Sequence, residues 1–164
     1  LKGELAHYKT RAGRNEDASQ MLRDIYYELL NRQGEGHWET ILAASNYASC
    51  LGALHRYEEA KSIFRRTLPI VRRVHGENNE ATLKLRFAYV ATLYGDTSAP
   101  IKDRLEAVMK LEDLERTARR VLGGAHPSVQ LMEQQLPNWR AALRAHSDMS
   151  SLRDAMEAMT PGDA

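Results

Sequence analysis

The sequence predicts an all-α solenoid made of about three and a half copies of one helical hairpin. An acidic residue followed by alanine recurs at spacings of 42, 47 and 48 residues. A glycine stands sixteen residues after each of the first three alanines, and a histidine or asparagine follows each glycine by three residues. Recurrence at fixed offsets is the signature of a repeat architecture. The recurring residues are Asp17-Ala18, Glu59-Ala60, Glu106-Ala107 and, more weakly, Asp154-Ala155, then Gly34, Gly76 and Gly123, then His37, Asn79 and His126.

The first copy, residues 1–36, is partial, and residues 1–164 are read as a single repeat domain. Residues 13–18 are predicted to form the turn into a helix whose apolar residues follow a helical period. Gly34 is expected to end that helix, because glycine adopts the positive φ of a helix C-terminus at little cost. The apolar stripe of this helix consists of Met21, Leu22, Ile25, Tyr26 and Leu29.

The second copy, residues 37–78, shows the pattern most clearly. Helices are predicted over about 38–54 and 58–74, and the second of them has an apolar face opposite an arginine-rich face. Pro69 lies inside this second helix, where it removes a backbone hydrogen bond and is expected to kink the helix. Ala48 and Ala60 are expected to be buried where helices pack closely.

The third and fourth copies depart from this pattern. The third, residues 79–125, begins at Asn79 as an N-cap, has a longer loop at residues 95–100, and continues with Pro100 in the first turn of a helix that ends at Leu122. The fourth, residues 126–159, reads as a degenerate cap in which Pro137 replaces a small residue. A lengthened turn is predicted to lead to a last helix over about 150–159, and residues 160–164 are expected to fray.

Composition excludes several classes of function. The net charge of +1, from 23 basic and 22 acidic residues, gives no overall attraction to nucleic acid or to a membrane surface. No apolar run approaches the ~20 residues of a membrane-spanning helix. A single cysteine excludes an internal disulfide, and no Cys/His spacing predicts a metal or a cofactor. We therefore expect an intracellular, cytoplasmic protein. The start at Leu1, within a repeat, indicates a piece of a longer polypeptide and leaves an organelle open.

Three motifs of the second copy are Gly34-x-x-His37-x-x-Thr40-Ile41, Ser45-Asn46-Tyr47-Ala48 and Arg56-Tyr57-Glu58-Glu59-Ala60. They resemble the motifs G-x-x-H-P-x-T-L, N-N-L-A and G-x-Y-x-E-A of tetratricopeptide repeats, in the 42-residue form found in kinesin light chains. The resemblance implies a right-handed superhelix in which the first helix of each hairpin lines a concave groove. It also implies a protein or peptide partner. The chain departs from the family at His55, where glycine is preferred, and at Val90 and Pro137, where alanine is preferred.

The first helices therefore hold the candidates for a binding site. Asn46 can donate to and accept from a peptide backbone at once, as family members often use that asparagine, or it can tether neighbouring helices. Small side chains along the groove leave room for a bound segment, or they serve close helix packing. The predicted groove residues are Leu42, Ser45, Asn46, Ser49, Lys84, Phe87, Tyr94, Gln134 and Asn138, with the small residues Gly52, Ala91 and Ala141 beside them.

Other conspicuous residues are assigned structural roles. The arginine pairs at 65–66, 72–73 and 119–120 are predicted to form a solvated face, because acidic residues are interspersed among them. His37 and His126 are read as junction residues, since neither has a convergent catalytic partner. The glycine-rich residues 123–126 superficially look like a phosphate-binding loop, but they follow a helix and lack the Lys-Ser/Thr of that motif. They are predicted to form a helix–helix turn. Cys50 is expected to be buried, and Trp38 and Trp139 are expected to pack between repeats.

Together these features predict a protein–protein interaction module that binds a peptide or protein segment in the concave groove, without chemistry. The alternative is a structural subunit held permanently inside a larger assembly. An enzyme ranks third, because the sequence shows neither a nucleophile–base pair nor a set of metal ligands.

Overall fold

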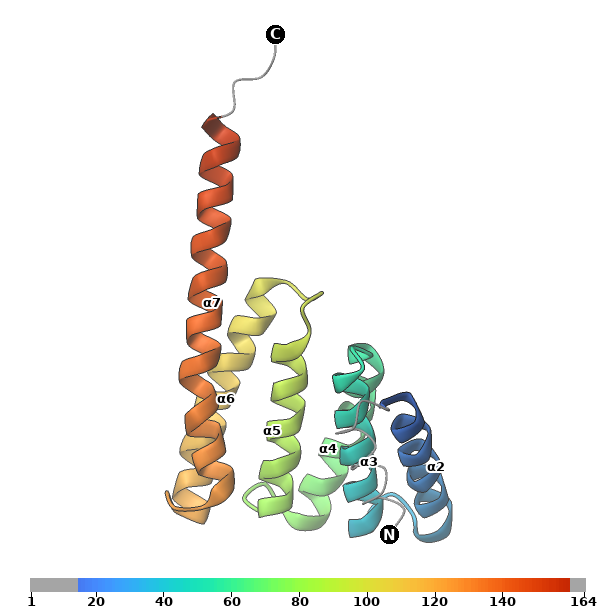
Figure 1. Ribbon diagram of the computed structural model, residues 1–164. Coiled ribbons are helices and arrows are strands. Elements are labelled where there is room, and N and C mark those ends of the chain that lie inside the picture. The colour runs from blue at the N-terminus through green and yellow to red at the C-terminus, as the bar shows by residue number, and fades with distance from the viewer. Residues whose placement is uncertain (1–14, 160–164) are drawn as a thin grey trace.

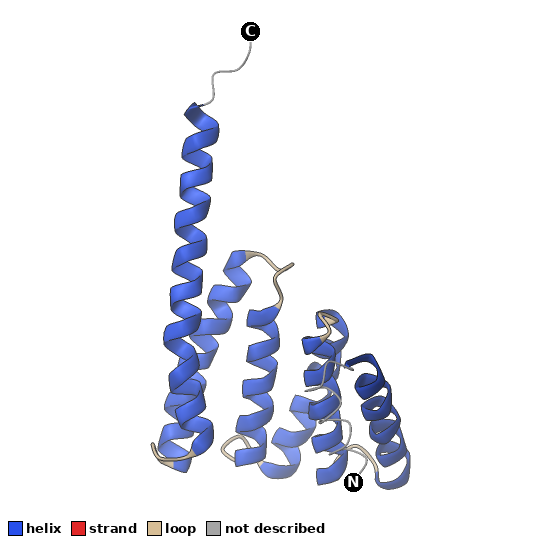
Figure 2. Ribbon diagram, viewed as in Figure 1, coloured by secondary structure: helices blue, strands red, loops and turns tan. Residues whose placement is uncertain are grey.

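The computed structural model describes residues 15–159, with side chains between residues 16 and 147, and in this part of the chain every regular element is a helix. The helices are α2 (Asn15–Gln33), α3 (Trp38–Ala53), α4 (Tyr57–His75), α5 (Glu80–Gly95), α6 (Ile101–Leu122) and α7 (Pro127–Met159) (Figures 1 and 2). This confirms the predicted all-α helical-hairpin solenoid. The turn predicted at residues 13–18 is wrong for residues 15–18, because α2 already begins at Asn15. Residues 13–14, the remains of the first copy before them and the predicted fraying at 160–164 lie outside the described residues.

The helices stack side by side in chain order, and successive helices run in opposite directions (Figure 1). Each packs on the next, from α2 on α3 through to α6 on α7, and α3 also contacts α5 directly. Such nearest-neighbour contact is the packing of a solenoid, in which each hairpin covers the apolar face of its neighbour. The second and third predicted copies therefore correspond to the hairpins α3–α4 and α5–α6.

Three of the recurring alanines, and Ala48 with them, are fully buried between helices. Ala18, Ala48, Ala60 and Ala107 have no exposed surface, and each belongs to one of three clusters of buried apolar residues that follow one another along the array. A larger side chain at such a position would overlap the facing helix. The predicted burial of Ala48 and Ala60 is confirmed, and Cys50 is buried as well, with 4% of its surface exposed.

The junctions between copies share one conformation. The glycine that ends each second helix has a positive φ, between 83° and 88°, which a residue with a Cβ atom adopts only at a cost. Three residues later, a side chain accepts a hydrogen bond from a backbone N–H of the first helical turn, as an N-cap does. The glycines are Gly34, Gly76 and Gly123, and the capping residues are His37, Asn79 and His126. Their predicted junction roles are confirmed.

The fourth copy differs from its prediction. Instead of two helices joined by a lengthened turn, α7 is one continuous helix with Pro137 inside it, and it extends beyond the rest of the array (Figure 1). In copy three, the first helix meets α6 with apolar residues of one cluster, whereas the residues 47 positions later are polar or proline. A second helix folded back on α7 would find little apolar surface to bury. The apolar residues are Leu83, Phe87, Val90 and Ala91, and their counterparts are Gln130, Gln134, Pro137 and Asn138.

Candidate functional site

A pocket of about 440 Å³ opens between the N-terminal halves of α3 and α5. It lies between the first helices of two successive hairpins, which is where the resemblance places the groove. Helix α3 supplies one wall, α5 the other, and the end of α4 with the following turn closes one side. The lining residues are Trp38, Ile41, Leu42, Ser45, His75, Asn79, Glu80, Ala81, Lys84 and Leu85.

The pocket has a buried apolar floor and an exposed apolar rim. Ile41 and Leu85 form the floor, with 5% and 2% of their surfaces exposed. Trp38 and Leu42 lie one helical turn apart on α3, and 58% and 51% of their surfaces are exposed. Large apolar side chains grouped in a concave site, rather than scattered singly, mark surfaces that bind ligands or other proteins.

The opposite rim is polar and carries both signs of charge. Lys84 Nζ lies 2.5 Å from a carboxylate oxygen of Glu80, one turn earlier on α5, and His126 Nε2 lies 3.5 Å from the same oxygen. The hydrogen bond from Lys84 lowers the pKa of Glu80 below its usual value. Glu80 is therefore ionised at neutral pH, and its negative charge offsets the positive charge of Lys84.

The structure brings together only some of the predicted site residues. Leu42, Ser45 and Lys84 line the pocket. Asn46 and Ser49 are exposed further along α3, outside the lining, and Gln134 and Asn138 are exposed on α7. Phe87 is half-buried against the cluster that joins α5, α6 and α7.

Tyr94 is held among three helices. Its ring stacks on Trp139 of α7, with centroids 4.1 Å apart and planes 2° from parallel, and its hydroxyl donates to the Trp139 carbonyl oxygen at 3.2 Å. The Arg104 guanidinium of α6 lies 4.8 Å from the same ring centre. The expectation that Trp139 packs between repeats is confirmed. The same expectation for Trp38 is wrong, because this side chain stands exposed at the pocket rim.

Sequence reasoning missed seven of the ten lining residues. They are Trp38, Ile41, His75, Asn79, Glu80, Ala81 and Leu85. Trp38 and Leu42 stand at i and i+4, so that they share one helical face, and this spacing was a usable signal. His75 and Asn79 carried no such signal, since their place in the lining depends on how α4 ends against α5. Asn79 was recognised only as a cap.

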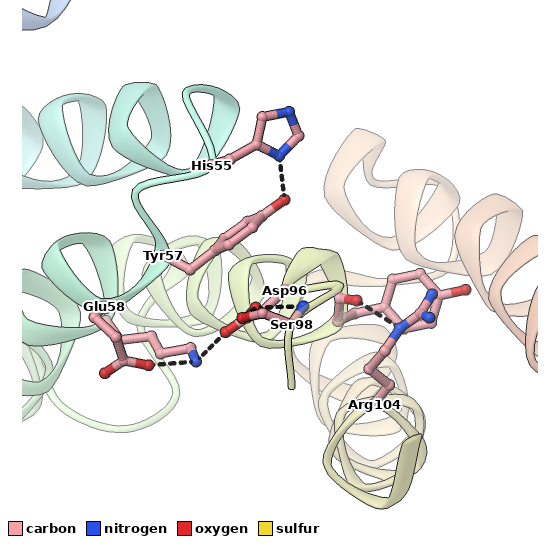
Figure 3. A network of polar contacts seen from close by, with 8 residues as sticks. His55, Tyr57, Glu58, Asp96, Ser98 and Arg104 are labelled. Atoms are coloured by element: carbon pink, nitrogen blue, oxygen red, sulfur yellow. Dashed lines mark hydrogen bonds and ion pairs between the residues drawn. The ribbon is translucent and has the colours of Figure 1, made fainter. Parts of the chain in front are cut away.

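A second polar cluster lies at the other end of α5, around the longer loop that was predicted at residues 95–100 (Figure 3). Asp96 Oδ2 accepts a hydrogen bond from Lys61 at 2.5 Å, and Asp96 Oδ1 accepts from the backbone N–H and the hydroxyl of Ser98. Nearby, His55 Nδ1 lies 2.9 Å from the Tyr57 hydroxyl. These groups bind one another, which indicates that the cluster anchors the loop. It does not border the pocket, which is lined by the other end of α5.

Two structural findings bear on other kinds of site. Among residues 15–159, no group of three His, Cys, Asp or Glu side chains is arranged to hold a metal ion. Over the same residues, no helix combines the length and apolar composition of a membrane span.

The arginine pairs are exposed, as predicted, and several pair with acidic neighbours, among them Arg72 with Glu77 and Arg73 with Glu35.

Comparison with known families agrees with this geometry. No curated protein matches the sequence. Residues 39–99, which span both helices of the second hairpin and the first helix of the third, match the family model of the tetratricopeptide repeat. Tetratricopeptide repeats generally mediate protein–protein interactions. Residues 39–99 are thus similar to tetratricopeptide repeats, whereas membership of the whole chain in that family and its kinesin-light-chain-like subtype stay predictions.

Proposed function

We propose that this protein is an interaction module that captures a peptide segment of a partner protein in the pocket between α3 and α5. The observation that carries the proposal is the pairing of a buried apolar floor, Ile41 and Leu85, with an exposed apolar rim, Trp38 and Leu42. A large apolar side chain of the partner would fill the pocket and cover the rim. Buried anchors of this kind supply most of the binding energy at protein interfaces.

The polar residues would orient the segment. Ser45 lies beside the apolar rim, and Asn46 and Ser49 continue along α3 from it, where they can bond to a peptide backbone. Across the pocket, Lys84 and Glu80 present a cation and a carboxylate to the flanks of the anchor. Because these charges nearly cancel, shape and apolar contact would select the segment more than net charge does. The mechanism is an equilibrium of binding, with no chemical step.

Selection of random displayed peptides on the purified chain tests this proposal. Enriched peptides should share a large apolar residue, and Leu42→Asp should abolish their binding because it places a charge at the rim. Leu105→Asp is the matched control: it makes the same change at a leucine of α6 that is equally exposed, 53% against 51%. Asn46→Ala and Lys84→Ala should weaken binding without unfolding the chain. Peptides that bind the Leu42→Asp variant undiminished would refute the site.

One observation favours the alternative of a structural subunit. Helix α6 exposes Ile101, Leu105 and Met109 at four-residue spacing, with 44%, 53% and 59% of their surfaces accessible. In the preceding hairpin, the repeat positions of α4 that are equivalent to Leu105 and Met109 hold polar residues, Glu58 and Ser62. The exposed apolar row is therefore particular to α6. If this surface is permanently covered inside an assembly, a photo-crosslinker at residue 105 should trap a single partner protein, in an amount equimolar to the chain. A crosslinker at residue 42 should trap the partner instead if the pocket proposal holds.

A further inference from the structure

Helix α7 carries an apolar row that attaches it to the array, and this row stops partway along the helix. Its members alternate at spacings of three and four residues, and they are buried or packed against the cluster shared with α5 and α6. The next positions of the same row, His146 and Ser150, are polar. Leu143 is the last residue of α7 in this cluster, and the end of α7 extends beyond the other helices (Figure 1). The row consists of Val129, Met132, Leu136, Trp139 and Leu143.

A second row of small and apolar residues begins where the first one ends. It alternates strictly between steps of three and four residues, which is the a/d pattern of a coiled coil. Its first two members, Ala142 and Ala145, are exposed, so the row does not pack on the array where it begins. In the sequence the row continues to the last residue of the helix. Its members are Ala142, Ala145, Met149, Leu152, Met156 and Met159.

Among the helices that the structure describes, α7 packs on α6, and its end does not fold back on its own beginning. The positions that such a fold would cover are polar or proline: Gln130, Gln134, Pro137 and Asn138. The helix instead continues through this region to Met159. A helix that carries an a/d row of this kind gains stability by pairing with another helix.

The charges beside the row favour an identical helix in parallel orientation. When Ala142 and Met149 occupy a positions, Asp148 occupies a g position and Arg153 the following e position. In a parallel pair, each g residue meets the e residue five positions later in the partner. Asp148 of each copy would thus meet Arg153 of the other, which gives two ion pairs in a symmetric dimer. In an antiparallel pair e positions meet e positions, which would bring Arg153 toward Arg153 or His146.

We propose that the end of α7, residues 142–159, is a self-association helix that pairs in parallel with the same segment of a second copy. The paired helices would join two arrays at one end and leave both α3–α5 pockets accessible. Two copies would then bind a partner that displays two segments with higher avidity than one copy does. The inference rests on the continuity of α7 and on its sequence pattern, and it is independent of the function proposed for the pocket.

Sedimentation equilibrium over a series of chain concentrations tests the proposal. The unmodified chain should show a monomer–dimer equilibrium. Leu152→Asp should raise the dimer dissociation constant by about tenfold or more, because it places a charge at a d position. Ser151→Asp introduces the same charge one residue away, outside the row, and should leave the constant unchanged. Circular dichroism should show both variants folded, since the array does not depend on this end of the helix.

A charge exchange tests the orientation. Asp148→Arg and Arg153→Asp should each weaken the dimer, and the double variant should restore it, since the pair is then reversed in both copies. A chain that stays monomeric at every concentration would overturn the proposal. The row would then pair with a different protein rather than with a second copy. Equal association in the Leu152→Asp variant would overturn it too, because the contact would lie elsewhere. Failure of the double variant to recover would overturn the parallel pairing.

Discussion

Lys61 Nζ lies 2.5 Å from Asp96 Oδ2, in an ion pair that joins the first turn of α4 to the loop after α5. Both side chains are buried, with 9% and 4% of their surfaces exposed. Burial opposes the charge of Lys61, but hydrogen bonds to Asp96 and Glu58 outweigh it and raise its pKa. Burial likewise opposes the charge of Asp96, and bonds from Lys61 and Ser98 lower its pKa. The pair holds the loop between α5 and α6 against the preceding hairpin.

Asp96→Asn should destabilise the chain by roughly 3 kcal/mol, because it leaves a buried ammonium without its main counter-charge. Chemical denaturation followed by circular dichroism would measure the loss. Glu58→Gln is the control. It removes the other carboxylate bonded to Lys61, but that side chain is 76% exposed, so the loss should stay below about 1 kcal/mol. Equal effects from the two variants would show that burial does not strengthen the inner pair.

The same pair should make stability depend on acid pH. The pKa of Asp96 is lower in the folded chain than in the unfolded one, so its contribution is complete above the ordinary carboxyl value of about 3.9 and is lost as the pH falls through the folded value. Denaturation midpoints measured from neutral pH downward should therefore fall more steeply for the unmodified chain than for Asp96→Asn. Parallel curves would contradict the linkage.

Ala60→Leu tests the register of the repeat. Ala60 has no exposed surface, so the larger side chain must push α3 and α4 apart, at a cost of roughly 1–3 kcal/mol. Ser62→Leu adds a leucine two residues later, at an exposed position of α4, and should change the free energy of unfolding little. Thermal melting of both variants provides the comparison. If Ala60→Leu melted like the unmodified chain, the assignment of Ala60 to the helix contact would be wrong.

The sequence was informative where one residue suffices to mark a structure. Gly34, Gly76 and Gly123 end helices because of their own φ preference, and Asn79 caps one with its own side chain. Such marks recur at fixed offsets in the first three copies, so that their spacing reveals the hairpins before any contact is known. Ala60 belongs to the same class, since close helix approach requires a small residue at that point.

Contacts between distant residues could not be predicted in this way. Lys61 and Asp96 are 35 positions apart, and neither residue type suggests a buried ion pair, because both are usually exposed. The pocket depends on the placement of α3, α5 and the end of α4 together, which no single motif encodes. The lengthened turn predicted before the last helix at about 150–159 is wrong for a different reason. The repeat pattern was extended to a fourth copy in which the residues that would pack against a second helix are polar or proline.

His55 should be replaceable by glycine with a gain in stability. Its φ is 61°, a left-handed conformation that costs a residue with a Cβ atom about 1 kcal/mol or more. Loss of the contact with the Tyr57 hydroxyl offsets part of the gain, so His55→Gly should raise stability by up to about 1 kcal/mol. His55→Ala loses the same contact without relief at φ and should be destabilising. A His55→Gly variant with a lower melting temperature than His55→Ala would contradict the claim that the positive φ at residue 55 costs stability.

The two tryptophans should report separately on the pocket and on the core. Trp38 is 58% exposed at the pocket rim, whereas Trp139 is 8% exposed and stacked on Tyr94. The Trp38→Phe variant retains Trp139, whose fluorescence should be blue-shifted and resistant to acrylamide quenching. The Trp139→Phe variant retains Trp38, whose emission should lie near that of a solvated indole and be readily quenched. A peptide that occupies the pocket should shift the emission of the Trp139→Phe variant to the blue and leave that of Trp38→Phe unchanged. Equal quenching of both variants would contradict the exposed rim, and a peptide that shifts only the Trp38→Phe variant would place binding away from the pocket.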